Sequence, residues 1–187
     1  MLPEFLMQAA TDVKAALASQ NEKLVISESC TGGLVATLLT SLPGISDFFC
    51  GSAVVYRWDT KMKWLGVQPE PLEKYTDVSR ETAREMALGV LNQTPEATLA
   101  ASITGHLGPN APTHQDGLIC IAMARRIITE LHNPPDLITV ESFQSDTLID
   151  EFSIESHLAG QELTLRQQRQ LAAARQLLKL VLNALER

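Results

Sequence analysis

The segment VISESCTGGLVATLL, residues 25–39, decides the fold of this chain. An apolar run with β-branched residues leads into a row of small polar residues and two glycines, and a helical pattern follows. Such a strand–turn–helix unit directs backbone N–H groups at whatever lies before the helix. Gly32 and Gly33 carry no side chains, so a ligand can approach the backbone closely. The segment therefore predicts either a site for a phosphate or an acyl-transfer oxyanion, or a plain polar turn in which Ser29 or Thr31 caps the helix.

Helical periodicity marks further segments on both sides of this unit. Apolar residues recur at helical spacing over residues 1–20, again behind Ser79 as a cap, and from Glu162 onward. The stretch DTKMKWLG predicts a short helix with Asp59 as its N-cap and Gly66 as its stop.

Five short apolar runs predict strands, and these are KLVIS, DFFCGSAVVY, ATLAASITG, GLICIAMARR and DLITVESF. Strands that alternate with helices are typical of a layered α/β protein. We expect a three-layer α/β/α sandwich with a mixed, mostly parallel sheet of about five strands, in a single domain over residues 1–187. Residues 145–160 are polar and acidic without a clear period.

Composition excludes several classes of function. The net charge of −7 and the lack of a Lys/Arg cluster argue against a nucleic-acid partner. No apolar run approaches the ~18 residues that a membrane span needs, and the acidic residues Glu4 and Asp12 do not fit a secretory signal. Cys30, Cys50 and Cys120 lack the spacing of a disulfide framework or a zinc site, so we expect a cytoplasmic protein without a metal or cofactor.

Two residues of the turn are candidate nucleophiles. Cys30 is the more nucleophilic, but it needs a base, and no histidine stands in a partnered position. A buried, inert cysteine is the commoner case. Ser29 also needs a base, which a lysine from elsewhere in the chain can supply, as in Ser–Lys hydrolases.

The candidate bases lie in VVYRWDTKMKWLGV, residues 54–67. A lysine acts as a base only when burial or a neighbouring positive charge lowers its pKa from about 10.4. Trp58 and Trp64 suggest an apolar setting for this change. The alternative is that Lys61 and Lys63 are ordinary solvated lysines on a short helix.

Several motifs, in this order, resemble one known family. SESCTGG is followed by PGIS, then by VVY, TK and LGV, then by VSRETAREMALGV and ITG. Together they resemble the C-terminal domain family of the competence/damage-inducible protein CinA, over Leu24 to Pro109. Members of that family that stand alone are nicotinamide-nucleotide amidases.

The resemblance implies a reaction and roles for particular residues. Ser29 is expected to be the nucleophile of an amidohydrolase, Lys61 its general base and Tyr56 the residue that orients or relays the proton. The LGV motif fixes the register that favours Lys61. The expected reaction is hydrolysis of the carboxamide of nicotinamide mononucleotide to nicotinate mononucleotide and ammonia, without a metal. The expected substrate-binding residues are Thr31, Gly32, Gly33, Thr104 and Gly105.

The chain departs from the family pattern in the part expected to recognise the substrate, and the segment 125–160 is also atypical for the family. Trp58 stands where the family has Asn, and the loop HLGPNAPTHQDG, residues 106–117, has Ala111 and Pro112 where flexible glycines are expected. These changes leave two alternatives: the same Ser–Lys chemistry on a different small amide, or a nucleotide-binding domain without catalysis. His106 is either a phosphate or ammonia contact or a plain loop histidine.

The last helix carries the remaining open questions. The family's Gly-Asp-Arg before this helix has no clear counterpart, and Arg166 or Arg169 could replace its arginine. The arginines of this helix are otherwise interpreted as a solvated face. The expected partner is a small-molecule nucleotide, and the apolar faces of the first and last helices are compatible with a homo-oligomer.

Overall fold

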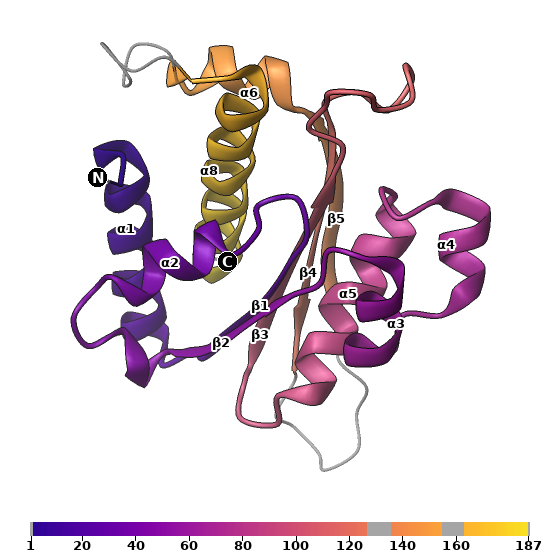
Figure 1. Ribbon diagram of the computed structural model, residues 1–187. Helices are drawn as coiled ribbons and strands as arrows, with labels where there is room; N and C mark the ends of the chain where they lie inside the picture. Colours follow the sequence, from indigo (N-terminus) through magenta and orange to yellow (C-terminus); the bar gives the residue numbers. More distant parts are fainter. Residues whose placement is uncertain (1, 127–135, 155–162, 187) are drawn as a thin grey trace.

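The computed structural model describes residues 2–126, 136–154 and 163–186, and these build one sheet with helices on both faces (Figure 1). The elements in chain order are α1 (Glu4–Gln20), β1 (Leu24–Glu28), α2 (Leu34–Thr40), the 3-10 turn η1 (Ile45–Asp47), β2 (Phe49–Val54), α3 (Trp58–Leu65), α4 (Pro69–Tyr75), α5 (Arg80–Gln93), β3 (Leu99–Gly105), β4 (Leu118–Arg125), β5 (Asp136–Gln144), α6 (Ser145–Glu151) and α8 (Leu165–Leu185).

The strand order of the sheet is β2-β1-β3-β4-β5. β1 pairs in parallel with β2 and β3, whereas β4 is antiparallel to both of its neighbours. Four strands therefore run one way and β4 runs the other. Helices α1, α2 and α8 cover one face, and α3, α4 and α5 cover the other (Figure 1). The expected three-layer α/β/α sandwich with a mixed, mostly parallel sheet is confirmed.

The two faces of the sheet differ in the size of their side chains. Residues that point toward α1 and α8 are large, among them Ile103, Ile121 and Met123. Residues that point toward α5 are small, among them Ala100 and Ala122. Alternation along a strand sends successive side chains to opposite faces, so α5 can lie closer to the sheet than α8 can.

The helix ends test the capping predictions. Ser79 caps α5 as expected, because its hydroxyl accepts a hydrogen bond from Thr82 N at 3.1 Å. Gly66 ends α3 in the left-handed conformation, also as expected. Asp59 as the N-cap of α3 is wrong: the helix begins at Trp58, Arg57 holds the cap position, and Asp59 pairs with Lys63 inside the helix.

Other boundaries were not visible in the sequence. Helices α4 and α6 were not predicted, and α6 falls in the stretch 145–160 that had no period. The last helix begins after Thr164, which forms a capping box with Gln167. Glu162, where we expected that helix to start, lies outside the described residues. In the part of the chain that the structure describes, every helix is too short or too polar to cross a membrane.

Gly89 allows α3 to lie directly on α5. A β-carbon built at Gly89 would lie 2.1 Å from the backbone oxygen of Leu65, the last residue of α3. Gly89 sits inside a regular helix, so it is needed for this close approach rather than for an unusual backbone angle. The contact fixes the position of α3, which carries Lys61.

We expect Gly89→Ala to lower the free energy of unfolding by about 3 kcal/mol, because the added methyl group overlaps backbone that cannot move away. Gly66→Ala is the matched comparison. Its β-carbon has nothing within 4 Å, and only the positive φ of 72° opposes it, which costs about 1 kcal/mol. Urea unfolding measures both values, and equal losses would contradict the role assigned to Gly89.

Candidate active site

Ser29 lies at the carboxyl end of β1, where the sheet ends and the turn to α2 begins. Its N–H donates to the carbonyl of Ile103 on the neighbouring strand β3 at 3.0 Å. The side chain is 5 % exposed. The carboxyl edge of parallel strands is where open α/β sheets bind ligands, so Ser29 occupies a position suited to chemistry.

Lys61 lies on α3, and its side chain reaches Ser29 from the face of the sheet opposite to the one that α2 covers (Figure 1). Its Nζ lies 2.9 Å from Ser29 Oγ, 3.0 Å from the carbonyl oxygen of Val55 and 3.4 Å from that of Tyr56. Lys61 has no exposed surface. Burial lowers the pKa of Lys61 from its usual value, although the nearby carboxylate of Asp77 opposes this shift.

The two lysines that the sequence left open have different surroundings. Lys63 is exposed and forms an ion pair with Asp59 at 3.0 Å. Trp58 and Trp64 are also exposed, so the expectation that they provide the apolar setting is not met. Lys61 is buried because α3 packs on α5.

Tyr56 contacts Lys61 through its backbone rather than its side chain. Its carbonyl is one of the acceptors around Nζ. The phenol ring is 55 % exposed, and its hydroxyl accepts a hydrogen bond from Arg166 Nη2 at 3.0 Å.

Cys30 is buried behind the turn. Burial raises the pKa of its thiol to about 12, so the thiol stays protonated and is a poor nucleophile. A β-carbon at Gly105 would lie 3.1 Å from Cys30 Sγ and 2.7 Å from Ile119 Cγ2. Gly105 therefore serves the packing of Cys30 against β4.

The glycines of the turn use their N–H groups within the protein. Gly32 N donates to Ser29 O at 3.1 Å, and Gly33 N donates to Glu28 Oε2 at 3.1 Å. Both residues have positive φ, 62° and 94°, which explains why glycine stands there. Their amides are not available to a ligand in this structure, contrary to the expectation from the sequence.

Glu28 is a functional residue that the sequence reasoning missed. Its carboxylate is fully buried and accepts hydrogen bonds from Gly33 N, Val35 N and Ala36 N at 2.9–3.1 Å and from Ser52 Oγ at 3.2 Å. Glu28 thus caps α2, a role expected for Ser29 or Thr31. An acidic residue just before a helix start was the available signal, because a carboxylate there is favoured by the helix dipole.

Helix α8 holds the turn from the other side. Gln170 Nε2 donates to the carbonyls of Cys30 and Thr31 at 3.2 and 3.1 Å. Thr31 is 1 % exposed, and its hydroxyl has no partner within the described ranges. The turn is therefore fixed at its carbonyls as well as at its amides.

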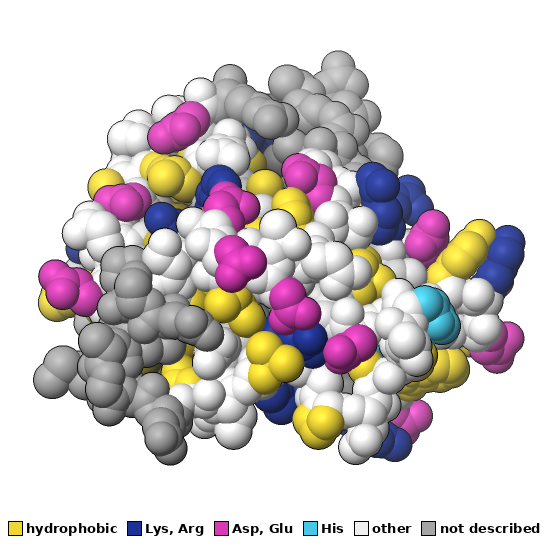
Figure 2. All heavy atoms as spheres, turned by 90° about the horizontal axis from the view of Figure 1, so that it is seen from above, with side chains coloured by type: hydrophobic (Ala, Val, Ile, Leu, Met, Phe, Trp, Pro, Cys, Tyr) yellow, Lys and Arg dark blue, Asp and Glu magenta, His cyan; other side chains and the backbone are white. Residues whose placement is uncertain are grey.

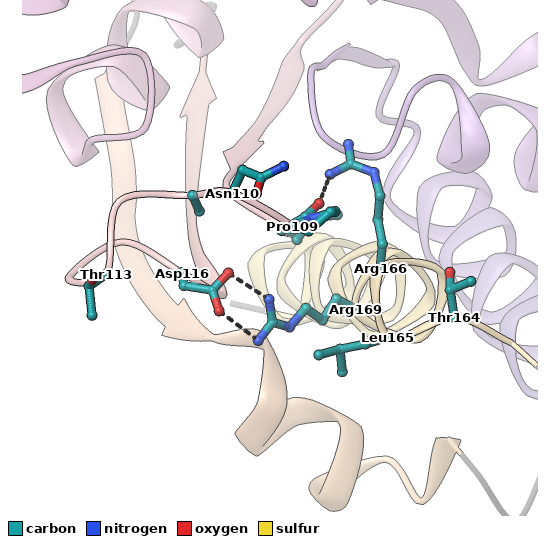
Figure 3. A pocket seen from close by; sticks show the side chains of 11 residues that line it. Pro109, Asn110, Thr113, Asp116, Thr164, Leu165, Arg166 and Arg169 are labelled. Carbon is teal, nitrogen blue, oxygen red and sulfur yellow. Dashed lines mark hydrogen bonds and ion pairs between the residues drawn. The ribbon is translucent and has the colours of Figure 1, made fainter.

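The arginines of α8 do not form the solvated face that the sequence suggested. Arg169 is 4 % exposed and pairs with Asp116 at 2.8 Å and Asp146 at 2.7 Å. Hydrogen bonds to these carboxylates raise the pKa of Arg169 further. Arg166 leaves the same end of α8 in another direction and donates to Gly108 O as well as to Tyr56 (Figure 3).

The remaining predicted residues support the site from β3. Thr104 is buried, and its hydroxyl donates to Asp77 O at 2.6 Å, which ties the segment between α4 and α5 to the strand. His106 is half-buried, and its backbone pairs with Leu118 and Gly117 at the start of β4. Neither contact assigns a ligand.

Comparisons with known proteins identify the family. The model of the CinA C-terminal domain matches residues 6–134, more than half of the chain. The chain belongs to the CinA C-terminal domain family. A CinA-like protein of Syntrophomonas wolfei is 46% identical over 114 residues, and one of Trichormus variabilis is 38% identical over 153 residues. These matches cover 60% and 81% of this chain but only 27% and 34% of the relatives, so the chain spans about a third of their length or less.

Solved structures of CinA proteins share the whole fold. The competence/damage inducible protein CihA from Agrobacterium tumefaciens superposes with a TM-score of 0.79 at 26% identity, covering 100% of this chain and 99% of that one. A CinA superfamily protein from Klebsiella pneumoniae gives 0.77 at 21% identity, covering 97% and 98%. The similarity therefore extends through the segments in which this chain departs from the family motifs.

Arg166 bridges the loop 106–117 and Tyr56, because it donates to Gly108 O and to the Tyr56 hydroxyl. Each end of this bridge lines a different cavity of this CinA domain. The first cavity, of ≈ 700 Å³, is lined by Tyr56, Trp58 and Asp77 and by further residues at the start of α3. The second, of ≈ 750 Å³, lies between the loop 106–117 and the start of α8 (Figure 3). Its lining residues are Leu107, Gly108, Pro109, Asn110, Ala111, Thr113, Asp116, Thr164, Leu165, Arg166 and Arg169. Two residues that depart from the family pattern, Trp58 and Ala111, are therefore cavity walls, whereas Pro112 lines neither cavity.

The surface over this end of the sheet carries mixed charge. Figure 2 shows Lys and Arg side chains interspersed with Asp and Glu on the face it presents.

We expect Glu28→Gln to lower the free energy of unfolding by about 3 kcal/mol, because the amide nitrogen faces N–H donors that it cannot accept from. Ser52→Ala is the control. It removes one of the donors to the same carboxylate and is expected to cost about 1 kcal/mol. Urea unfolding distinguishes the two, and a Glu28→Gln protein as stable as Ser52→Ala would show that Glu28 does not hold the turn.

Lys61 should make stability depend on pH. Between its lowered native pKa and the unfolded value of about 10.4, the unfolded chain holds more protons than the native protein, so stability rises with pH. The unfolding free energy of wild type minus that of Lys61→Met is expected to increase as the pH rises from 7 to 10. Lys63→Met retains Lys61 and should keep the wild-type slope. A flat difference between wild type and Lys61→Met would contradict a lowered pKa.

Proposed function

We propose that this chain is an amidohydrolase in which Ser29 is the nucleophile and Lys61 the general base. The observation that carries the proposal is the 2.9 Å separation of Lys61 Nζ from Ser29 Oγ, with the lysine fully buried. A nucleophile within hydrogen-bond reach of a base whose pKa is lowered is the arrangement that activates a hydroxyl.

The acceptors around Nζ suit the neutral amine. Its two N–H groups can donate to the carbonyls of Val55 and Tyr56. The lone pair then remains for the hydroxyl proton of Ser29. In this account Tyr56 orients the base through its carbonyl, so the tyrosine keeps a role without its hydroxyl.

The reaction proceeds in two halves. As Ser29 Oγ attacks the carboxamide carbon, Lys61 takes the hydroxyl proton and the carbonyl oxygen becomes an oxyanion. Collapse of this intermediate breaks the C–N bond, and Lys61 returns the proton to the departing nitrogen as ammonia leaves. Water then attacks the ester on Ser29 with Lys61 again as base, which releases the carboxylic acid and restores the hydroxyl.

The substrate that we propose is nicotinamide mononucleotide. Membership in the CinA family supports it, since the resemblance to this family is what implies a nicotinamide-nucleotide amidase. Tyr56 and Trp58 offer aromatic walls for a pyridine ring. Arg166 lines the second cavity and is the cation best placed for a phosphate, because Arg169 is committed to two aspartates.

A different small carboxamide is the second candidate. The observation that favours it is the lining of the cavities, where Trp58 replaces an amide side chain and Pro109 and Ala111 form walls of the altered loop. Neither cavity is lined by Ser29 or Lys61, so these residues can change what is recognised without replacing a member of the pair.

Ammonia release from nicotinamide mononucleotide tests the proposal. We expect wild type to be active and Ser29→Ala and Lys61→Met to lose at least about 1,000-fold in kcat. Lys63→Met is the matched control on the same helix and should stay within about 2-fold of wild type, since its ion pair is exposed. An active Ser29→Ala protein would overturn the assignment of the nucleophile.

Two further outcomes separate the alternatives. Labelling of Ser29 by a fluorophosphonate without hydrolysis of the mononucleotide would identify the second candidate. Thermal stabilisation by nucleotides with neither labelling nor turnover would indicate a binding domain, since a ligand of the native state raises its stability.

A further inference from the structure

The turn that holds Ser29 leaves one residue with free donors. Gly32 and Gly33 use their N–H groups within the turn and on Glu28. Thr31, by contrast, has a hydroxyl without a partner and an N–H that donates to no acceptor among residues 2–126, 136–154 and 163–186. Buried hydrogen-bond donors rarely lack an acceptor in a folded protein. Two of them on one buried residue, two positions from the nucleophile, point to a ligand atom that accepts hydrogen bonds.

The direction of the Thr31 N–H follows from the contact with Gln170. Gln170 Nε2 holds the carbonyl of Cys30 at 3.2 Å from the α8 side. A trans peptide is planar, and its N–H points opposite to its C=O, so the Thr31 N–H is directed away from α8. α8 and α3 lie on opposite faces of the sheet (Figure 1). The Thr31 N–H therefore faces the side from which Lys61 approaches Ser29.

Gln170 also holds the next peptide. It donates to Thr31 O at 3.1 Å, and the N–H of that peptide, on Gly32, donates back to Ser29 O. One amide group thus sets two successive peptide planes in a turn whose glycines would otherwise let them rotate.

We propose that Gln170 is a positioning residue that orients the Thr31 N–H toward the oxyanion of the acyl-transfer intermediate. This inference rests on the proposed function of Ser29 and Lys61. Donors stabilise an oxyanion only when they are already aimed at the place where its charge develops. Gln170, which lies 139 positions from Thr31 in the sequence, orients the Thr31 N–H in this way without contacting the substrate.

The role predicts an effect on rate rather than on binding or folding. α8 remains anchored by Arg169 and by its apolar contacts with α1 when Gln170 is replaced. We expect Gln170→Leu, which keeps much of the shape but has no donor, to lower kcat about 30-fold, somewhat less than outright loss of an oxyanion donor. KM should stay within about 2-fold, because the interaction is made only in the transition state.

Gln168→Leu is the matched control. Gln168 lies on the same helix and donates to Leu163 O at 3.3 Å, outside the turn. This variant should keep the wild-type kcat. The unfolding midpoint in urea should match that of wild type to within the loss of one hydrogen bond for Gln168→Leu and of two for Gln170→Leu. Gln170→Lys restores a donor at the same position and should recover most of the lost rate.

A fluorophosphonate gives a second readout that does not depend on the substrate. Ser29 Oγ forms a bond to phosphorus, fluoride leaves, Lys61 takes the hydroxyl proton, and the phosphonyl oxygen occupies the position of the oxyanion. The labelling rate should fall in Gln170→Leu by about the same factor as kcat and stay unchanged in Gln168→Leu.

The possible results distinguish the two proposals. Equal labelling of wild type and Gln170→Leu, or equal losses in the Gln170 and Gln168 variants, would overturn the positioning role while leaving Ser29 as the nucleophile. No labelling of Ser29 in wild type would overturn the proposed function, and this inference with it.

Discussion

The contact between the buried amine of Lys61 and the hydroxyl of Ser29 is the constraint on which the rest of this structure depends. A charged lysine without exposed surface is costly, so the fold must either surround it with oxygen atoms or allow it to become neutral. It does both: two backbone carbonyls and one hydroxyl lie within 3.4 Å of Nζ, and burial lowers the pKa. The position of α3 is set by the missing side chain of Gly89. Packing between two helices thereby places a buried amine with a lowered pKa beside the hydroxyl of Ser29.

The turn after β1 is held both through its backbone N–H groups and through its backbone carbonyl groups. Glu28 accepts from its amides, and Gln170 donates to its carbonyls. The amino end of α2 is consequently occupied by a carboxylate of the chain itself. It cannot serve as an anion site of the kind that glycine-rich turns often provide. A short-range contact from Glu28 and long-range contacts from Gln170 thus fix the turn, and Thr31 is the residue whose N–H and hydroxyl have no acceptor in the described part of the chain.

Local signals were sufficient for most of the fold. Short apolar runs located the five strands of the described sheet, and Ser79 and Gly66 located helix ends, because these features depend on neighbours within a few residues. The pairing of Ser29 with Lys61 was predicted from the resemblance to the CinA family, through the register of residues 65–67. Burial of Lys61 could not be read in the same way. It depends on Gly89, which lies on a different helix and looks like an ordinary helical glycine in the sequence.

Arg169 and Gln170 could not be interpreted correctly from the sequence because their partners are far away along the chain. Arg169 resembled a surface residue because Asp146 and Asp116 lie 23 and 53 positions from it, and Gln170 reaches across 139 and 140 positions. Only Glu28 had a local signal. The missed long-range contacts share one feature: they start from the first turns of α8. The first turns of α8 therefore contact the turn that holds Ser29.

The same helix end also connects the chemistry to recognition. Arg166 joins Gly108 of the altered loop to the hydroxyl of Tyr56, beside the Lys61 helix. Each end of this bridge is a wall of a different cavity. A change in the loop 106–117 that moves Gly108 therefore shifts Arg166 and the phenol ring of Tyr56 and reshapes both cavities. Ser29 is held by Ile103 on β3, and Lys61 is held by the backbone carbonyls of Val55 and Tyr56 and by the packing of α3 on α5. If Ser29 and Lys61 act as proposed, such an arrangement allows the substrate preference to diverge through one loop while the nucleophile and the base stay in place.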